Sequence, residues 1–226
     1  MTAALSELCG LYHAPVERFV RLWCGDAEKA RDLTQEFFLA VLQRQNLGGA
    51  DAERGRFRSY LLGAVKHFLS DAADRAQTLR RGGGIEHVPL QPQAAGEDVD
   101  ASHECPSDFL DIKATPPDVE FDRQWAFAVL GQALDSLEQE MAAEGRAPQF
   151  AVLKPWLAGQ DATPGQTLAA HAAELGVTES AVRVALHRLR QRFREAVRQQ
   201  VAQTLNAPSD LAVEEELRHL RATLLG

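Results

Sequence analysis

Apolar residues recur every three to four positions along most of this 226-residue chain, which is the spacing of amphipathic helices. No stretch of useful length alternates between apolar and polar residues as a half-buried strand would. Gly25 is a helix stop signal, Asp26 can cap the next helix, and Pro15 is tolerated in an opening turn. The pattern predicts an all-α fold, with helices over about residues 12–24, 26–42, 57–80, 119–143, 149–158, 166–175, 178–198 and 209–224.

The segment Gln166–Arg194 has the pattern of a helix-turn-helix. Gly176 can take the positive φ of a tight turn, and Thr178 is a good N-cap for the second helix. The apolar stripe of that helix is formed by Val182, Leu186, Leu189, Phe193 and Val197. Between these positions lie Arg183, Arg188, Arg190, Arg192, Arg194 and Arg198. An apolar back with a cationic front favours DNA binding, and the alternative is an amphipathic hairpin with a solvated basic face.

Segments rich in helix breakers divide the chain into two helical domains, residues 1–85 and 119–205. Residues 86–118 combine glycine, proline and acids without any period, which predicts a flexible acidic linker. The pattern over residues 206–226 predicts a short amphipathic helix capped by Ser209. Its apolar positions are Leu211, Leu217, Leu220 and Leu224.

The net charge of −8 conceals an uneven distribution. Residues 54–81 and 183–198 each carry a net charge of +5, whereas residues 93–122 carry nine acids and a single lysine. Two cationic segments are typical of a nucleic-acid-binding protein. The acidic segment has three possible roles: shielding the cationic faces of the free protein, entering a basic channel of a partner, or keeping the linker soluble.

Other features narrow the classes of function. No apolar run approaches the ~20 residues of a membrane span, and the N-terminus lacks the pattern of a secretion signal. Three scattered cysteines suit a reducing cytoplasm and form no metal-binding pair. No phosphate loop, nucleophile elbow or catalytic carboxylate pair occurs. We therefore expect a cytoplasmic protein that is not an enzyme, needs no metal or cofactor, and does not bind a membrane.

The order of these segments resembles the sigma-70 family of bacterial RNA polymerase initiation factors. DAEKARDLTQEFFLAVL (Asp26–Leu42) and RGRFRSYLLGAVKHFLSDAADRAQTLRR (Arg54–Arg81) are similar to conserved region 2, and the helix-turn-helix is similar to region 4. Nothing resembles the other family regions, so the chain looks like the compact extracytoplasmic-function (ECF) type. The resemblance implies core RNA polymerase as a partner, through the coiled coil of its largest subunit and its flap. It also implies promoter DNA and, as a further candidate partner, an anti-sigma or other regulatory protein.

The resemblance assigns three sets of residues. Polymerase docking falls on Asp32, Gln35 and Glu36, which lie opposite the apolar side of their helix. Recognition and melting of −10 DNA fall on Arg56, Phe57, Arg58, Tyr60, Lys66 and His67, because unstacked bases need aromatic faces and cations. Reading of −35 DNA falls on Thr178, Glu179, Ser180, Arg183, Arg188 and Arg190.

Some positions depart from the family pattern. Tyr60 and His67 stand where the ECF branch often has tryptophan and asparagine, so its −10 base preference does not carry over. Val184 and Ala185 replace polar or basic residues, which indicates more recognition of DNA shape and phosphate than of bases. Core packing is the alternative role for Phe57 and Tyr60.

Two other functions are open: a stand-alone helix-turn-helix regulator, and a sigma-like protein adaptor. The basic and aromatic −10 segment favours the sigma factor, since a sensor domain has no need of it.

Overall fold

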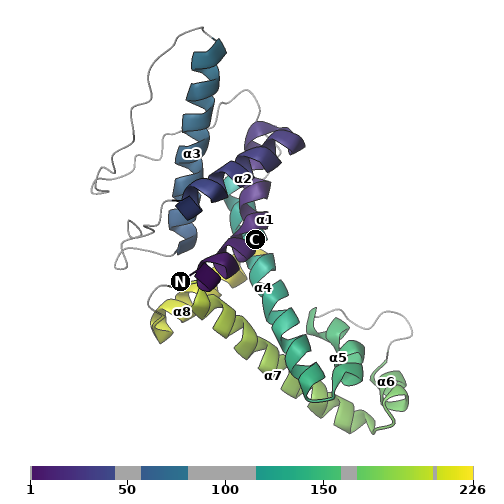
Figure 1. The fold of residues 1–226 in the computed structure, drawn as a ribbon. Helices are drawn as coiled ribbons and strands as arrows, with labels where there is room; N and C mark the ends of the chain where they lie inside the picture. Colours follow the sequence, from purple (N-terminus) through teal and green to yellow (C-terminus); the bar gives the residue numbers. More distant parts are fainter. Residues whose placement is uncertain (1, 44–56, 81–115, 159–166, 206–207, 226) are drawn as a thin grey trace. The chain divides into compact units, whose positions relative to one another are not determined.

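A computed structural model describes residues 2–43, 57–80, 116–158, 167–205 and 208–225, and every element in these ranges is a helix (Figure 1). The prediction of an all-α fold is confirmed for this part of the chain. The α-helices are α1 (Thr2–Cys24), α2 (Ala27–Gln43), α3 (Phe57–Arg80), α4 (Pro117–Ala143), α5 (Ala147–Leu153), α6 (Leu168–Glu174), α7 (Glu179–Gln203) and α8 (Asp210–Leu225). A 3-10 helix, η3 (Lys154–Ala158), follows α5 directly.

The chain forms two compact units, Met1–Gln124 and Trp125–Gly226, and the division falls within α4. The first turns of α4 therefore belong to the N-terminal unit, whereas the sequence pattern placed the start of the second domain at residue 119. Of the acidic segment 93–122, the described ranges include residue 116 and the start of α4. The rest of this segment lies outside the described residues.

In the N-terminal unit, α1, α2 and α3 pack on one another. Gly25 adopts a φ of 70° between α1 and α2. The Asp26 carboxylate then accepts hydrogen bonds from the backbone N–H groups of Glu28 (2.8 Å) and Lys29 (3.2 Å), as expected of a cap. The buried apolar residues are Leu11, Tyr12, Val16, Phe19, Val20, Ala30, Leu33, Phe37, Phe38, Leu61, Val65, Leu69 and Phe121.

The start of α1 differs from the prediction. The helix begins at Thr2, so Pro15 lies in its interior and not in its opening turn. Proline has no N–H for the carbonyl four residues earlier, and this costs about 3 kcal/mol in a helix interior. Pro15 is itself buried, on the same stripe as Leu11, Tyr12 and Phe19. Packing of that stripe offsets the missing hydrogen bond, which a propensity rule does not anticipate.

In the C-terminal unit, the later part of α4 packs with α5, α6 and α7. The shared core consists of Leu137, Met141, Phe150, Leu153, Ala172, Val182 and Leu189, with Phe193 packed against it. The prediction of a single helix over residues 149–158 was wrong in its second half, where the chain forms η3. Pro155 is the cause, because it lacks an N–H group and its ring disfavours a continuing α-helix.

The helix-turn-helix signals are confirmed. Gly176 adopts a φ of 66° between α6 and α7. The Thr178 side chain caps α7 by accepting a hydrogen bond from the N–H of Ala181 (3.2 Å). Four of the five predicted apolar positions of α7 are buried, and Phe193 is half-buried.

The terminal helix α8 packs on α7. The Ser209 hydroxyl accepts a hydrogen bond from the N–H of Ala212 (3.2 Å), which confirms the predicted cap. Leu211 was wrongly placed on the apolar side and is 70% exposed. The buried stripe instead runs through Val213, Glu216 and Leu220, whose spacing turns residue 211 away from it.

In the described ranges, none of the helices has the length and apolar character needed to cross a membrane.

Candidate polymerase and nucleic-acid interfaces

The predicted docking residues lie together on one side of α2. Asp32, Gln35 and Glu36 are exposed, whereas Leu33 and Phe37, on the opposite side, are buried. Within the part of the chain that the structure describes, none of the three side chains makes a hydrogen bond or an ion pair. Their side chains present two carboxylates and an amide, which suit a basic partner surface.

Leu39 extends this α2 face and was missed by the sequence argument. It is 57% exposed, three residues after Glu36 and seven after Asp32, so it continues the same stripe. The helical spacing alone could have found it. An exposed leucine beside acids gives the face an apolar anchor that a docking surface needs.

The aromatic residues at the start of α3 differ in exposure. Phe57 is half-buried against Tyr12, with ring centroids 5.2 Å apart. Tyr60 is 37% exposed and its ring lies 6.3 Å from that of Phe57. His67 is exposed seven residues further on, which places it on the side of α3 that carries Tyr60. Of the two described aromatic rings assigned to −10 DNA, that of Tyr60 is therefore the one exposed for stacking. Arg56 lies outside the described residues.

Arg58 occupies a different environment from Lys66, which is also assigned to −10 DNA. It begins the stripe of α3 that continues through Leu61, Val65 and Leu69, and its side chain is only 7% exposed. Its guanidinium forms an ion pair with Asp122 of α4. In this arrangement Arg58 is a buried pairing residue and offers no cation to DNA.

Lys66 lies on the surface of α3, with its side chain 44% exposed. Its ammonium group forms an ion pair with the Asp118 carboxylate at 2.6 Å. Unlike Arg58, Lys66 thus has a cation that solvent can reach, and an acid of the same chain already contacts it.

The residues assigned to −35 DNA lie along the first half of α7, from its N-cap onward, but hold different partners. Thr178 is the cap, and its hydroxyl lies 3.1 Å from that of Ser180. Arg183 forms an ion pair with Glu179 at 2.6 Å, one turn earlier. Arg190 donates to the carbonyl oxygen of Trp156 in η3 (3.1 Å), which ties α7 to its neighbour.

Arg188 is exposed and makes no hydrogen bond or ion pair with any described residue. Together with Ser180 it lines a groove of about 510 Å³ between α7, the end of α4 and the start of α5. The apolar floor includes Met141, Leu153 and Leu189. Arg146 and Arg192 also line the groove, and sequence reasoning assigned neither to the site. Arg146 and Arg192 are paired with acids, so Arg188 is the arginine of this groove that suits an anionic group such as a DNA phosphate.

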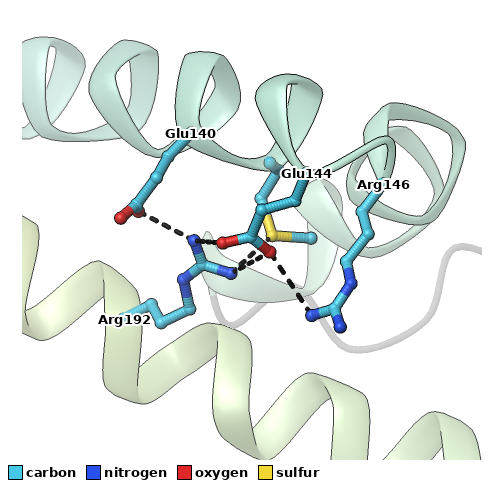
Figure 2. Close-up of polar contacts among 5 residues, drawn as sticks. Glu140, Glu144, Arg146 and Arg192 are labelled. Carbon is cyan, nitrogen blue, oxygen red and sulfur yellow. Dashed lines mark hydrogen bonds and ion pairs between the residues drawn. The ribbon is translucent and has the colours of Figure 1, made fainter.

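Arg192 is held by Glu140 of α4 and by Glu144, which directly follows that helix, as Figure 2 shows. Its guanidinium lies 2.7 Å from a Glu144 carboxylate oxygen and 2.9 Å from one of Glu140, and Arg146 pairs with Glu144 at 3.4 Å. The hydrogen bond from Arg192 lowers the pKa of Glu144, and the same bond raises the pKa of Arg192. This network fixes α7 against α4 and orients the arginine side of the groove.

Arg198 has a comparable structural role further along α7. Its guanidinium forms ion pairs with Glu214 and with Asp210 (3.0 Å), both in α8, and these contacts raise its pKa. Among the described residues, no group of three or more His, Cys, Asp or Glu side chains could hold a metal ion.

In the comparison with protein families, residues 8–78 match the model of sigma-70 region 2. The matched segment covers the later part of α1, all of α2 and nearly all of α3, which carry the docking face and Tyr60. No curated protein and no solved structure matched the chain. The region 2 match supports membership of this chain in the RNA polymerase sigma-70 family.

Proposed function

We propose that this protein is a sigma factor of the ECF type, which joins core RNA polymerase and directs initiation at specific promoters. The observation that carries the proposal is the region 2 match over residues 8–78, because that region of sigma factors serves polymerase binding and promoter melting. A stand-alone helix-turn-helix regulator would not need such a segment. The protein acts in the cytoplasm and catalyses no reaction of its own.

Docking to polymerase takes place through α2. Asp32 and Glu36 meet a basic coiled coil of the largest subunit, Gln35 supplies hydrogen bonds, and Leu39 packs against its apolar surface. The support is the exposure of all four side chains on one stripe of a helix whose other side is buried. Charge complementarity of this kind mainly speeds association and excludes wrong partners.

Opening of −10 DNA takes place on α3. A base that leaves the duplex stacks on Tyr60, and Lys66 and His67 follow the strand backbone. Stacking on an aromatic side chain contributes about 1–3 kcal/mol per base, enough to offset much of the cost of unpairing. Phe57 acts mainly by holding Tyr60, since its own ring packs against Tyr12.

Contact with −35 DNA takes place through α7 and the groove beside it. Arg188 is the most available cation at this groove, because Arg146 and Arg192 are paired with Glu144 and Glu140. Val184 also lines this groove, is 50% exposed, and offers an apolar contact but no hydrogen bond to a base edge. We therefore infer that phosphate and DNA shape contribute more than base reading at this element.

The docking proposal is tested by charge reversal on α2. Asp32→Lys, Gln35→Lys and Glu36→Lys together should lower the affinity for core polymerase on the order of 100-fold or more, because like charges would then face each other. The measurement is co-purification with tagged core polymerase, with helicity checked by circular dichroism.

The matched control carries the same change in charge on α3: Asp71→Lys, Asp74→Lys and Thr78→Lys, all at exposed positions. It should bind core polymerase as the unmodified protein does. Undiminished binding by the α2 variant, or equal loss in both variants, would count against docking through α2.

A further inference from the structure

Three acids at the start of α4 form ion pairs with three cations of the N-terminal unit. Asp118 pairs with Lys66 (2.6 Å), and Asp122 pairs with Arg58, both in α3. Glu120 pairs with Arg18 of α1 (3.2 Å). Residues 118 and 122 are one helical turn apart, so a single side of α4 serves both partners in α3.

The start of α4 is anchored in this unit by packing as well as by charge. Phe121 is fully buried, and its ring centroid lies 6.3 Å from that of Phe19 in α1. Asp118 and Glu120 also lie in the first turn of α4, where the helix dipole favours acids. The acids are therefore held in place whether or not a ligand is near.

The two ion pairs with α3 differ in their exposure to water. The Arg58 and Asp122 side chains are 7% and 22% exposed, and removing one partner would leave a charge in a poorly hydrated place. The Lys66 and Asp118 side chains are 44% and 50% exposed, and exposed pairs contribute little to stability. The first pair is an anchor, and the second can open at low cost.

We propose that the start of α4 is an autoinhibitory clasp, in which Asp118 occupies Lys66 and so weakens the binding of single-stranded DNA to the −10 face of the free protein. The proposal rests on the sigma-factor function, since it concerns regulation of that same face. Asp118 belongs to the same chain and is anchored nearby, so it competes at a high effective concentration with a phosphate in solution. A DNA strand presented by the polymerase displaces Asp118, while Arg58 and Asp122 keep α4 in place.

The clasp is tested with full-length protein and a labelled 20-nucleotide single-stranded DNA of mixed sequence, by fluorescence anisotropy at several salt concentrations. Asp118→Asn should tighten binding about two- to fivefold at low salt. It should also steepen the dependence of log K on log salt by roughly 0.7, the value for one added phosphate contact on a single strand. The control is Asp135→Asn, which removes an equal charge from an exposed position later in α4 and should change neither quantity.

A double variant separates the clasp from a general charge effect. In a Lys66→Ala background, Asp118→Asn should no longer tighten DNA binding, because the cation that it releases is absent. Unchanged affinity of Asp118→Asn, or the same gain with Lys66→Ala, would overturn the clasp. Core-polymerase co-purification is the independent readout: Asp118→Asn should bind core normally, and failure of the unmodified protein to bind core would instead overturn the proposed function.

Discussion

Individual arginines of α7 have distinct roles although the sequence presents them as one basic face. Arg190 donates a hydrogen bond to Trp156, Arg192 pairs with Glu140 and Glu144, and Arg198 pairs with acids of α8. Arg188 keeps its guanidinium available beside a groove. The distinction is physical, because a cation already paired must break that contact before it can neutralise a phosphate.

This difference predicts unequal effects on DNA binding. Arg188→Ala should weaken binding of a mixed-sequence 30-base-pair duplex and reduce the slope of log K against log salt by about 0.9, the value for one phosphate contact. Arg190→Ala should leave that slope nearly unchanged and lower the melting temperature instead, because it loses the hydrogen bond to Trp156. Equal slopes for the two variants would show that availability does not decide which arginine binds DNA.

At the scale of the helices, local signals fixed much of the structure in advance. The turn glycines and the helix caps act through their own backbone neighbours, so their positions could be predicted from the sequence alone. They are Gly25, Gly176, Asp26, Thr178 and Ser209. The apolar stripes of α2, α3 and α7 follow from helical spacing in the same way.

The structural features that local signals did not predict depend on contacts between residues distant in the sequence. Arg58 pairs with Asp122, 64 residues later, and nothing local distinguishes it from Lys66. Arg146 joins the groove of α7 only because α4 and α7 pack together. Pro15 lies within α1 because packing of its stripe offsets a lost hydrogen bond. A periodic pattern indicates which side of a helix is buried but does not indicate what covers it.

The contact between α4 and α7 in Figure 2 should depend on pH. Arg192 lowers the pKa of Glu144 from its ordinary value of 4.5. The unfolded chain therefore binds this proton more readily, so the stabilisation is complete above pH 4.5 and is lost as the pH falls through the lowered pKa.

The measurement is thermal unfolding of Glu144→Gln and the unmodified protein at several pH values from about 3 to 7. The unmodified protein should melt at the higher temperature near neutral pH, and the difference should disappear at the acidic end. The control Glu195→Gln, at an exposed position of α7 with no partner among the described residues, should show little difference at any pH. A Glu144→Gln difference that stays constant with pH would contradict the role of this ion pair.

At the scale of the whole molecule, the net charge of −8 combines parts with opposite roles. The α2 face carries the acids that we propose meet the polymerase, whereas α3 and α7 carry the cations that we propose meet DNA. The start of α4 contributes acids that pair with α3. A protein that must bind both a polymerase and its template needs both signs of charge, placed on separate faces.

The central claim, that this protein gives core RNA polymerase its promoter specificity, is tested most directly by transcription in vitro. Purified core polymerase would transcribe a library of genomic fragments with and without the protein, and RNA 5′ ends would be mapped. The account predicts discrete start sites that appear only with the protein, share two upstream elements, and are lost with the α2 triple variant. Start sites that are the same with and without the protein would contradict the account.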